Sequence, residues 1–272
     1  MTEALTPPSL VNQPTYLIRR FTEQSEPALV AEALRIHAAG YLSMGFLNNQ
    51  ALTDDGFVHP DIDRSRGKTT EYYLANNTSI PTDCATLRKV RLRPGGSIAD
   101  FDCYDLCRSS LFPDALAQFA RMCPGSQSVV EISSLARMPG ASPAAVWHLL
   151  RAAVCDSMAR RETWFCCIVV STYSTLARHM GPRFMRILGG DVAIEDGRVN
   201  SGVVLRPVAI DTSEFFDAML VDHGRTTGRT QHRIERSLLF YTEGADDNLL
   251  SPAVATFRDK PESHRLGTAD RP

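Results

Sequence analysis

The chain has 272 residues, of which 43% are hydrophobic and 22% are charged. These values are ordinary for a globular protein, and they exclude collagen-like, coiled-coil and wholly disordered chains. The 29 basic residues nearly balance the 31 acidic residues, so no overall charge draws the protein to nucleic acid or to an anionic membrane. We expect no nucleic-acid partner, and the length favours one core of about 200 residues with extensions.

The sequence also predicts no membrane span and no metal site. No apolar run reaches the roughly 18 residues of a spanning helix, and the polar, proline-bearing N-terminus lacks a secretory signal pattern. The seven cysteines are odd in number and lie partly in apolar stretches, which favours buried free thiols in a reducing compartment. No cysteine or histidine spacing typical of a metal site is present. We expect a cytoplasmic protein.

The chain begins with an arm, a helix and a long loop. Residues 1–24 contain three prolines and no sustained period, so we predict a flexible arm. Ser25 and Pro27 are typical of a helix start, and the apolar residues after them predict a helix that includes Tyr41. The acidic, turn-rich stretch 45–67 is either a lid over a substrate or a disordered insertion.

Aromatic and alternating patterns then predict two antiparallel strands, at 71–76 and 85–92. Further helices and strands follow from apolar periodicity. The predicted helices are 111–122, 173–180, 213–221 and 227–241, and the predicted strands are 184–188 and 203–210. We divide the chain into the arm (1–24), one domain (25–222) and a C-terminal helical extension with a disordered tail (223–272).

The most informative stretch is a strand, a glycine turn and a helix within residues 128–161. The strand holds one carboxylate, Glu131, among apolar side chains, and the turn at Gly140 ends it. Ser142 is a good N-cap for the helix that follows. The apolar run 164–171 has the length of a strand covered on both faces. This order predicts a βαβ unit in an α/β fold.

The glycine turn is a candidate phosphate site. A glycine there lets a ligand approach closely, and the first N–H groups of the next helix lack intrahelical acceptors. Arg137 adds positive charge. A plain structural turn is the alternative, because the spacing matches neither the Walker A nor the Rossmann pattern.

Glu131 is a candidate acid–base group, because a buried carboxylate is costly unless it is paired or functional. Arg88, Arg91 and Arg93 on an earlier strand are candidate ion-pair partners. A glutamate with a purely structural role is the alternative.

The order of elements from residue 25 to residue 211 resembles the GNAT acyltransferase superfamily. Residues 137–142 (RMPGAS) resemble its Q/R-x-x-G-x-G/A loop, whose backbone N–H groups hold the phosphates of an acyl thioester. Residues 131–135 (EISSL) resemble the E-x-S-R strand of the acyl-homoserine-lactone (autoinducer) synthases and the N-acyl amino acid synthases, although Ser134 stands where those synthases carry arginine. The resemblance implies a central mixed, largely antiparallel twisted sheet with helices on both faces.

The resemblance assigns candidate roles to individual residues. Glu131 would accept the proton of an attacking amine, and backbone N–H groups near Ser133 would stabilise the oxyanion. Tyr173, just after the next strand, is a candidate for protonating the leaving thiolate, with packing at the strand end as the alternative. The donor-binding candidates are Arg137, Gly140, Ala141 and Ser142, and the amine-binding candidates are Arg35, Asp61, Asp63, Arg88 and Arg91.

We expect an N-acyltransferase that moves an acyl group, fatty by resemblance, from acyl carrier protein or acyl-CoA to the amine of a small molecule such as an amino acid. The thioester is a cosubstrate, and we expect no tightly bound cofactor. The apolar run 164–170 either lines an acyl channel or is only a core strand. The basic segment 223–236 is either a docking face for an acidic carrier protein or a solvated helix face.

Two other classes of function stay open. A catalytically inactive GNAT-fold interaction or ligand-binding protein would need Glu131 only for structure. A thiol-dependent hydrolase would need a reactive cysteine close to a histidine. The candidate cysteines are Cys84, Cys103, Cys107 and Cys123.

Overall fold

The computed structural model describes residues 15–63, 70–92, 97–122, 129–200 and 202–260. Its strands form one sheet in the order β1-β2-β3-β4-β5-β8-β6, with β7 also paired to β8. Neighbouring strands are antiparallel except β4 and β5, so the predicted mixed, largely antiparallel sheet is confirmed. The strands are β1 (Tyr16–Thr22), β2 (Thr70–Asn77), β3 (Cys84–Arg91), β4 (Val129–Arg137), β5 (Thr163–Val169), β6 (Arg186–Ile187), β7 (Val192–Ala193) and β8 (Val204–Asp211).

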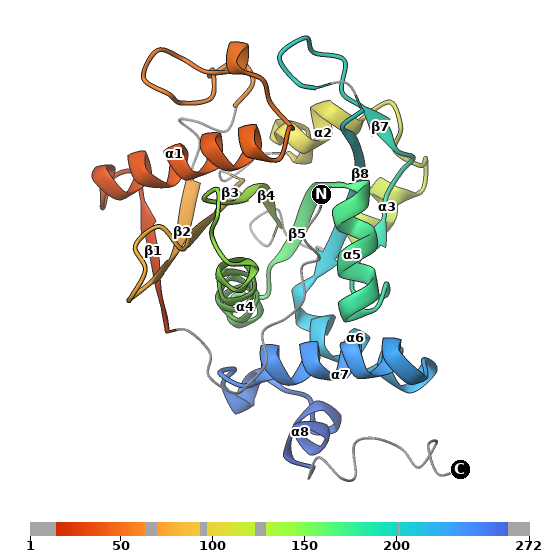
Figure 1. The fold of residues 1–272 in the computed structure, drawn as a ribbon. Helices are drawn as coiled ribbons and strands as arrows, with labels where there is room; N and C mark the ends of the chain where they lie inside the picture. The colour runs from red at the N-terminus through yellow and green to blue at the C-terminus, as the bar shows by residue number, and fades with distance from the viewer. Residues whose placement is uncertain (1–14, 64–69, 93–96, 123–128, 201, 261–272) are drawn as a thin grey trace.

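Helices cover both faces of the sheet, with α1 and α4 on opposite sides (Figure 1). On the first face α1 packs on β3 and β4, and α2 and α3 lie beside β5 and β8. On the second face α4 packs on β2 and β3, next to α5, α6 and α7, and α8 packs on α6. No helix in the described ranges is long and apolar enough to span a bilayer. The helices are α1 (Pro27–Ser43), α2 (Asp102–Cys107), α3 (Ala115–Met122), α4 (Pro143–Ala159), α5 (Val170–Met180), α6 (Phe215–Arg225), α7 (Gly228–Thr242) and α8 (Pro252–Asp259).

The central βαβ unit forms as predicted. Ser142 is the N-cap of α4, because its Oγ accepts a hydrogen bond from the Ala144 N–H at 3.1 Å. Apolar side chains of α4, such as Trp147 and Val154, enter the main hydrophobic core. The helix returns the chain to β5, which pairs parallel to β4. This unit pairs the first residues of β4 with the first residues of β5, and the two strands separate beyond Glu131 and Phe165.

The flexible arm predicted for residues 1–24 is wrong in its second part. Tyr16–Thr22 forms the edge strand β1, which pairs antiparallel with β2. Phe21 is its only fully buried side chain, while Leu17 is exposed. An edge strand with so little burial has no apolar period to mark it. Residues 1–14 lie outside the described residues.

The C-terminal helices belong to the same core as the sheet. Ile234 and Tyr241 of α7 and Phe257 of α8 are buried in the main hydrophobic cluster. The predicted boundary after residue 222 falls inside α6, and α8 extends to Asp259. The boundary is therefore wrong, because these helices bury apolar faces against the domain. The predicted tail, 261–272, lies outside the described residues.

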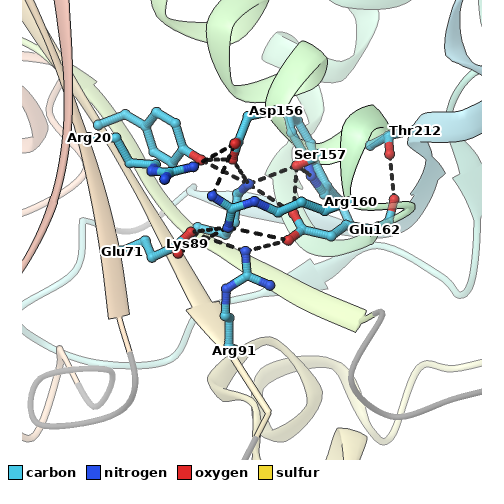
Figure 2. Close-up of polar contacts among 11 residues, drawn as sticks. Arg20, Glu71, Lys89, Arg91, Asp156, Ser157, Arg160, Glu162 and Thr212 are labelled. Carbon is cyan, nitrogen blue, oxygen red and sulfur yellow. Dashed lines mark hydrogen bonds and ion pairs between the residues drawn. The ribbon is translucent and has the colours of Figure 1, made fainter. Parts of the chain in front are cut away.

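A buried ionic network joins α4 to β2 and β3 (Figure 2). Lys89 is fully buried, and its Nζ donates to Ser157 Oγ at 2.7 Å and to Glu162 Oε2 at 2.9 Å. Arg91 pairs with Glu71 and Glu162 in the same network. Paired and hydrogen-bonded charges can be buried in this way. Arg91 therefore stabilises the α4 face of the sheet.

Candidate active site

The candidate site lies where β4 and β5 cease to pair. Their ladder covers only Val129–Glu131 and Thr163–Phe165, and it ends there. Two cavities, of about 250 and about 200 Å³, follow the unpaired parts of the two strands. We call the first the polar cavity and the second the apolar cavity. Both are lined by Tyr41, Phe46, Ile132, Ser133, Cys167 and Val169, so they meet at the divide between the strands.

The polar cavity lies on the α1 and α2 face of the sheet and is rich in carboxylates. Its walls come from α1, the loop after α1, β3, β4, α2 and the segment that precedes β8. Arginine and histidine each contribute one side chain to the described lining. The ionisable acid, arginine and histidine side chains are Asp61, Asp63, Asp102, Asp196, Glu131, Arg88 and His37.

Glu131 lies in the wall of this cavity and is 0% exposed. The N–H of Cys103 donates to its Oε1 at 2.8 Å, and the N–H of Asp102 donates to its Oε2 at 3.3 Å. These donors belong to the first turn of α2, where backbone N–H groups lack intrahelical acceptors. The carboxylate is therefore held by α2, whereas the sequence had suggested the arginines of β3.

The side chains of Arg88, Asp63 and Ser133, three of the candidate residues, lie in contact. The Arg88 guanidinium donates to both carboxylate oxygens of Asp63, at 2.6 and 2.7 Å, and its Nε donates to Ser133 Oγ at 2.8 Å. Arg88 pairs with Ser134 across the β3–β4 ladder while Lys89 pairs with Ile132, so Ser133 is an extra residue in a bulge. The bulge turns Ser133 toward Arg88 at the point where both cavities meet.

Asp61 is held at the rim by an arginine. Arg198 donates to Asp61 Oδ2 at 2.7 Å and also pairs with Asp196 at 3.1 Å. The hydrogen bond from Arg198 lowers the pKa of Asp61 and of Asp196. This cluster ties the acidic loop after α1 to the segment before β8, so the loop is fixed up to Asp63.

His37 is buried in the polar cavity with no hydrogen-bond partner at either ring nitrogen. Burial, helped by the Arg88 charge, lowers the pKa of His37 to about 3. The imidazole is therefore neutral and presents one donor and one acceptor within the cavity.

This burial predicts a loss of stability in acid. Unfolded His37 takes up a proton below about pH 6.5, whereas folded His37 stays neutral down to about pH 3. The unfolded state therefore binds more protons in this range, and His37 contributes up to about 1.4 kcal/mol of lost stability per pH unit as the pH falls. Urea unfolding at about pH 7 and about pH 5 should show that the free energy of unfolding falls less in His37→Gln than in wild type. The exposed His232→Gln is the control, and equal losses in wild type and His37→Gln would contradict the prediction.

The apolar cavity lies on the α4, α5 and α7 face. Its walls include side chains of β4 and β5, where the two strands no longer pair, and side chains of α4, α5 and α7. The run 164–170, for which the sequence left both a core strand and an acyl channel open, contributes several of them. The apolar and aromatic lining residues are Tyr41, Met44, Phe46, Ile132, Leu135, Ala136, Val146, Leu150, Val154, Trp164, Ile168, Val169, Leu176, Met180, Phe184, Ile210, Phe215 and Tyr241.

The glycine turn lies at one end of the apolar cavity, which Arg137 lines. Gly140 has a φ of 81°, a left-handed conformation that favours glycine. The Arg137 guanidinium donates to the carbonyl oxygen of Ala141 within the turn. The N–H of Ser142 donates to a carboxylate oxygen of Asp83, at 2.7 Å.

Six predicted residues line neither cavity: the turn residues Gly140, Ala141 and Ser142, and also Arg35, Tyr173 and Arg91. Arg35 is exposed and stacks on the ring of Phe57 at 5.2 Å. Tyr173 lines neither cavity, and Arg206 lies 4.7 Å from its ring. Arg91 belongs to the ionic network beneath α4. Sequence spacing cannot tell which face of a strand or helix meets a cavity when the neighbouring elements are unknown.

The cysteines of the described residues are free thiols, as expected. Burial raises the pKa of Cys84 to about 11. For Cys103 a hydrogen bond with Cys167 lowers the pKa, but burial and the charge of Glu131 raise it to about 12. Cys84 and Cys103 stay protonated at neutral pH and are therefore poor nucleophiles, whereas a hydrogen bond with Cys167 lowers the pKa of Cys107. Cys123, another candidate of the hydrolase hypothesis, lies outside the described residues.

Sequence reasoning missed several residues that complete the site. Tyr41 lines both cavities, and burial raises the pKa of its hydroxyl. Asp102 and Cys103, which hold Glu131, belong to a helix of six residues. The spacing of His37 and Tyr41, one helical turn apart, is the one signal that could have placed Tyr41 at the site.

Comparisons with known proteins give a structural relationship but no sequence relationship. No family model and no curated protein matches the chain. FeeM, an N-acyl amino acid synthase from uncultured soil microbes, matches with a TM-score of 0.53 and 14% identity over 78% of this chain and 99% of FeeM. The AHL synthase LasI matches with a TM-score of 0.48 and 14% identity, over 77% of this chain and 97% of LasI.

A variant of the spermidine N-acetyltransferase SpeG from Vibrio cholerae matches with a TM-score of 0.40 and 7% identity, over 74% of this chain and 95% of SpeG. Of these three structures, FeeM alone has a TM-score above 0.5. The predicted resemblance is thereby confirmed at the level of the fold: this chain has the GNAT-like fold of the N-acyl amino acid synthase FeeM.

Proposed function

We propose that the protein is an N-acyltransferase that moves an acyl group, preferably a fatty one, from a thioester to the amine of a small molecule such as an amino acid. The observation that carries this proposal is the meeting of two unlike cavities at the β4–β5 divide. One is apolar and suits an acyl chain, and the other holds a buried carboxylate beside polar groups. The likeness to the fold of an N-acyl amino acid synthase supports the same conclusion.

In the proposed reaction the amine nitrogen attacks the thioester carbonyl carbon, the C–N bond forms and the C–S bond breaks. Glu131 accepts a proton from the ammonium, directly or through water, so that the nitrogen has a free electron pair. As the C–S bond breaks, the nitrogen releases its second proton and the leaving thiolate takes up one, so the products are the amide and the free thiol, with the other proton on Glu131. The unpaired edge of β4 around Ser133 supplies backbone N–H groups for the carbonyl oxygen as it gains charge. The sequence-based assignment of the thiolate's proton to Tyr173 stays a prediction.

The donor in this proposal is acyl-CoA or the acyl-phosphopantetheine of an acyl carrier protein, and it is a cosubstrate. The turn at residues 137–142 is the proposed contact for the pantetheine arm of the donor. The amine occupies the polar cavity near Asp61, Asp63 and Arg88. A cytoplasmic location and an acyl carrier protein as partner belong to the same proposal.

Mass spectrometry of reaction products tests the proposal. The purified protein is incubated with acyl-CoA and acyl-carrier thioesters of several chain lengths, together with pooled amino acids and amines. The expected result is an N-acylated product that requires both the thioester and the protein. If no thioester is consumed, the proposal fails and an interaction protein with the same fold takes its place.

The apolar cavity predicts a preference for acyl length. Val154 of α4 lines it and is 1% exposed. Val154→Phe should fill part of the cavity and shift the preferred acyl chain to shorter lengths, because the added atoms take the volume of about two or three methylenes. Competition between thioesters of different lengths measures the shift. Val154→Ala is the matched variant, and it should move the preference in the opposite direction; unchanged profiles in both would contradict the prediction.

A further inference from the structure

Asp83 contacts the glycine turn at Ser142 and is almost fully buried. It precedes β3, and its side chain is fixed by three hydrogen bonds. Its Oδ2 accepts from Tyr16 Oη at 2.6 Å and from Asn77 Nδ2 at 2.9 Å, and its Oδ1 accepts from the Ser142 N–H at 2.7 Å. Tyr16 and Asn77 come from β1 and β2, so two strands hold the carboxylate against the start of α4.

Most backbone N–H groups around the turn already donate to acceptors within the protein, so few are left to bind an anion. The N–H of Ala141 donates to Met138 O at 2.9 Å, and that of Ala145 donates to Ser142 O at 3.1 Å. The N–H of Ala144 donates to Ser142 Oγ, and residue 143 is a proline without an N–H. Every N–H from residue 141 to residue 145 thus has an acceptor. At residue 142 that acceptor is a carboxylate, which bears the charge that a phosphate would bring.

A phosphate at this turn would meet two obstacles. It would have to replace the charge-assisted hydrogen bond between Ser142 and Asp83, which is stronger than a neutral one. It would also lie beside a fixed negative charge in a partly buried site, where like charges repel more strongly than in water. The same carboxylate does not oppose the uncharged pantetheine arm or the acyl chain of a thioester.

We propose that Asp83 determines donor specificity by excluding a phosphate from the turn at residues 137–142. This inference rests on the proposed acyl transfer and specifies which part of the donor is recognised. The pantetheine arm and the acyl chain supply the binding energy, and the diphosphate of coenzyme A adds none. Asp83 is a specificity-determining residue and takes no part in the chemical step. Coenzyme A thioesters then hold no advantage over pantetheine thioesters of the same acyl group.

The test compares kcat/KM for acyl-pantetheine and acyl-CoA with one acyl group and one amine. Wild type should use the two thioesters equally, to within about threefold. Asp83→Asn removes the charge and should raise kcat/KM for acyl-CoA about tenfold, the effect of one charge-assisted hydrogen bond gained by the phosphate, while acyl-pantetheine is unchanged. Tyr16→Phe is the matched control: it removes a hydrogen bond from the same carboxylate but keeps the charge, so the ratio should stay as in wild type.

A wild-type preference for acyl-CoA over acyl-pantetheine of more than about tenfold overturns the inference without any variant. An unchanged ratio in a folded Asp83→Asn protein, checked by thermal unfolding, overturns it as well. Calorimetric titration with coenzyme A alone separates the two proposals. If neither thioester reacts, the acyl-transfer proposal fails. The role of Asp83 is then still tested by the affinity for coenzyme A, which should be higher in Asp83→Asn than in wild type. If Asp83→Asn does not fold, Asp83→Ser takes its place.

Discussion

Glu131→Gln is expected to lower kcat for the proposed acyl transfer by at least about 100-fold, the usual contribution of a positioned proton acceptor. Glutamine keeps the shape of the side chain and one oxygen for the N–H groups of Asp102 and Cys103. It cannot take a proton from the ammonium of the acceptor. The loss should therefore appear in kcat, measured by product formation under saturating amine and thioester.

The control for this prediction is Glu243→Gln, the same chemical change at a side chain that is 56% exposed. It should leave kcat unchanged. A folded Glu131→Gln protein with wild-type kcat would show that Glu131 only fastens α2 to β4. The interaction-protein hypothesis gains support in a different case, in which wild type itself forms no product.

Arg88→Met is expected to lower the free energy of unfolding by about 3–5 kcal/mol, the cost of breaking a buried ion pair by removal of one partner. The side chains of Arg88 and Asp63 are 3% and 2% exposed, so water cannot replace the lost cation. Asp63 would remain buried with its main counter-charge gone, and Ser133 would lose the donor at Arg88 Nε. Urea denaturation of the purified protein measures the difference.

The double variant Arg88→Met with Asp63→Asn makes this prediction specific. Removal of both charges should recover most of the lost stability, because a neutral pair in place of a buried ion pair is often tolerated. Stability that stays low in the double variant would mean that the arginine stabilises the fold by packing alone. Neither protein is expected to show wild-type acyl transfer, since the pair lines the polar cavity.

The sequence predicted the parts of the fold that have a strong period of their own. The seam of α4 and the apolar run of β5 are buried on the faces that their spacing required, and Ser142 caps α4 as proposed. β1 and α2 escaped prediction. β1 is an edge strand with one fully buried side chain, and α2 has only six residues, too few for a helical period to be seen.

Within the site, residue identities were easier to predict than partners. Glu131, Asp63 and Arg88 all line the polar cavity. The partner of Glu131 is a backbone segment 28 residues away, and backbone N–H groups carry no sequence signature. Asp83 likewise stands in a turn with no motif around it, and its role depends on β1, β2 and α4 meeting at one point.

The early end of the β4–β5 ladder has a consequence for the order of events in the proposed reaction. Most walls of the polar cavity come from one face of the sheet and most walls of the apolar cavity from the other, and six side chains, Ser133 and Cys167 among them, line both. In the proposed reaction the amine and the acyl chain can therefore occupy separate cavities at the same time. We infer that the missing strip of hydrogen bonds lets the two substrates meet within the sheet, in a ternary complex of protein, amine and thioester.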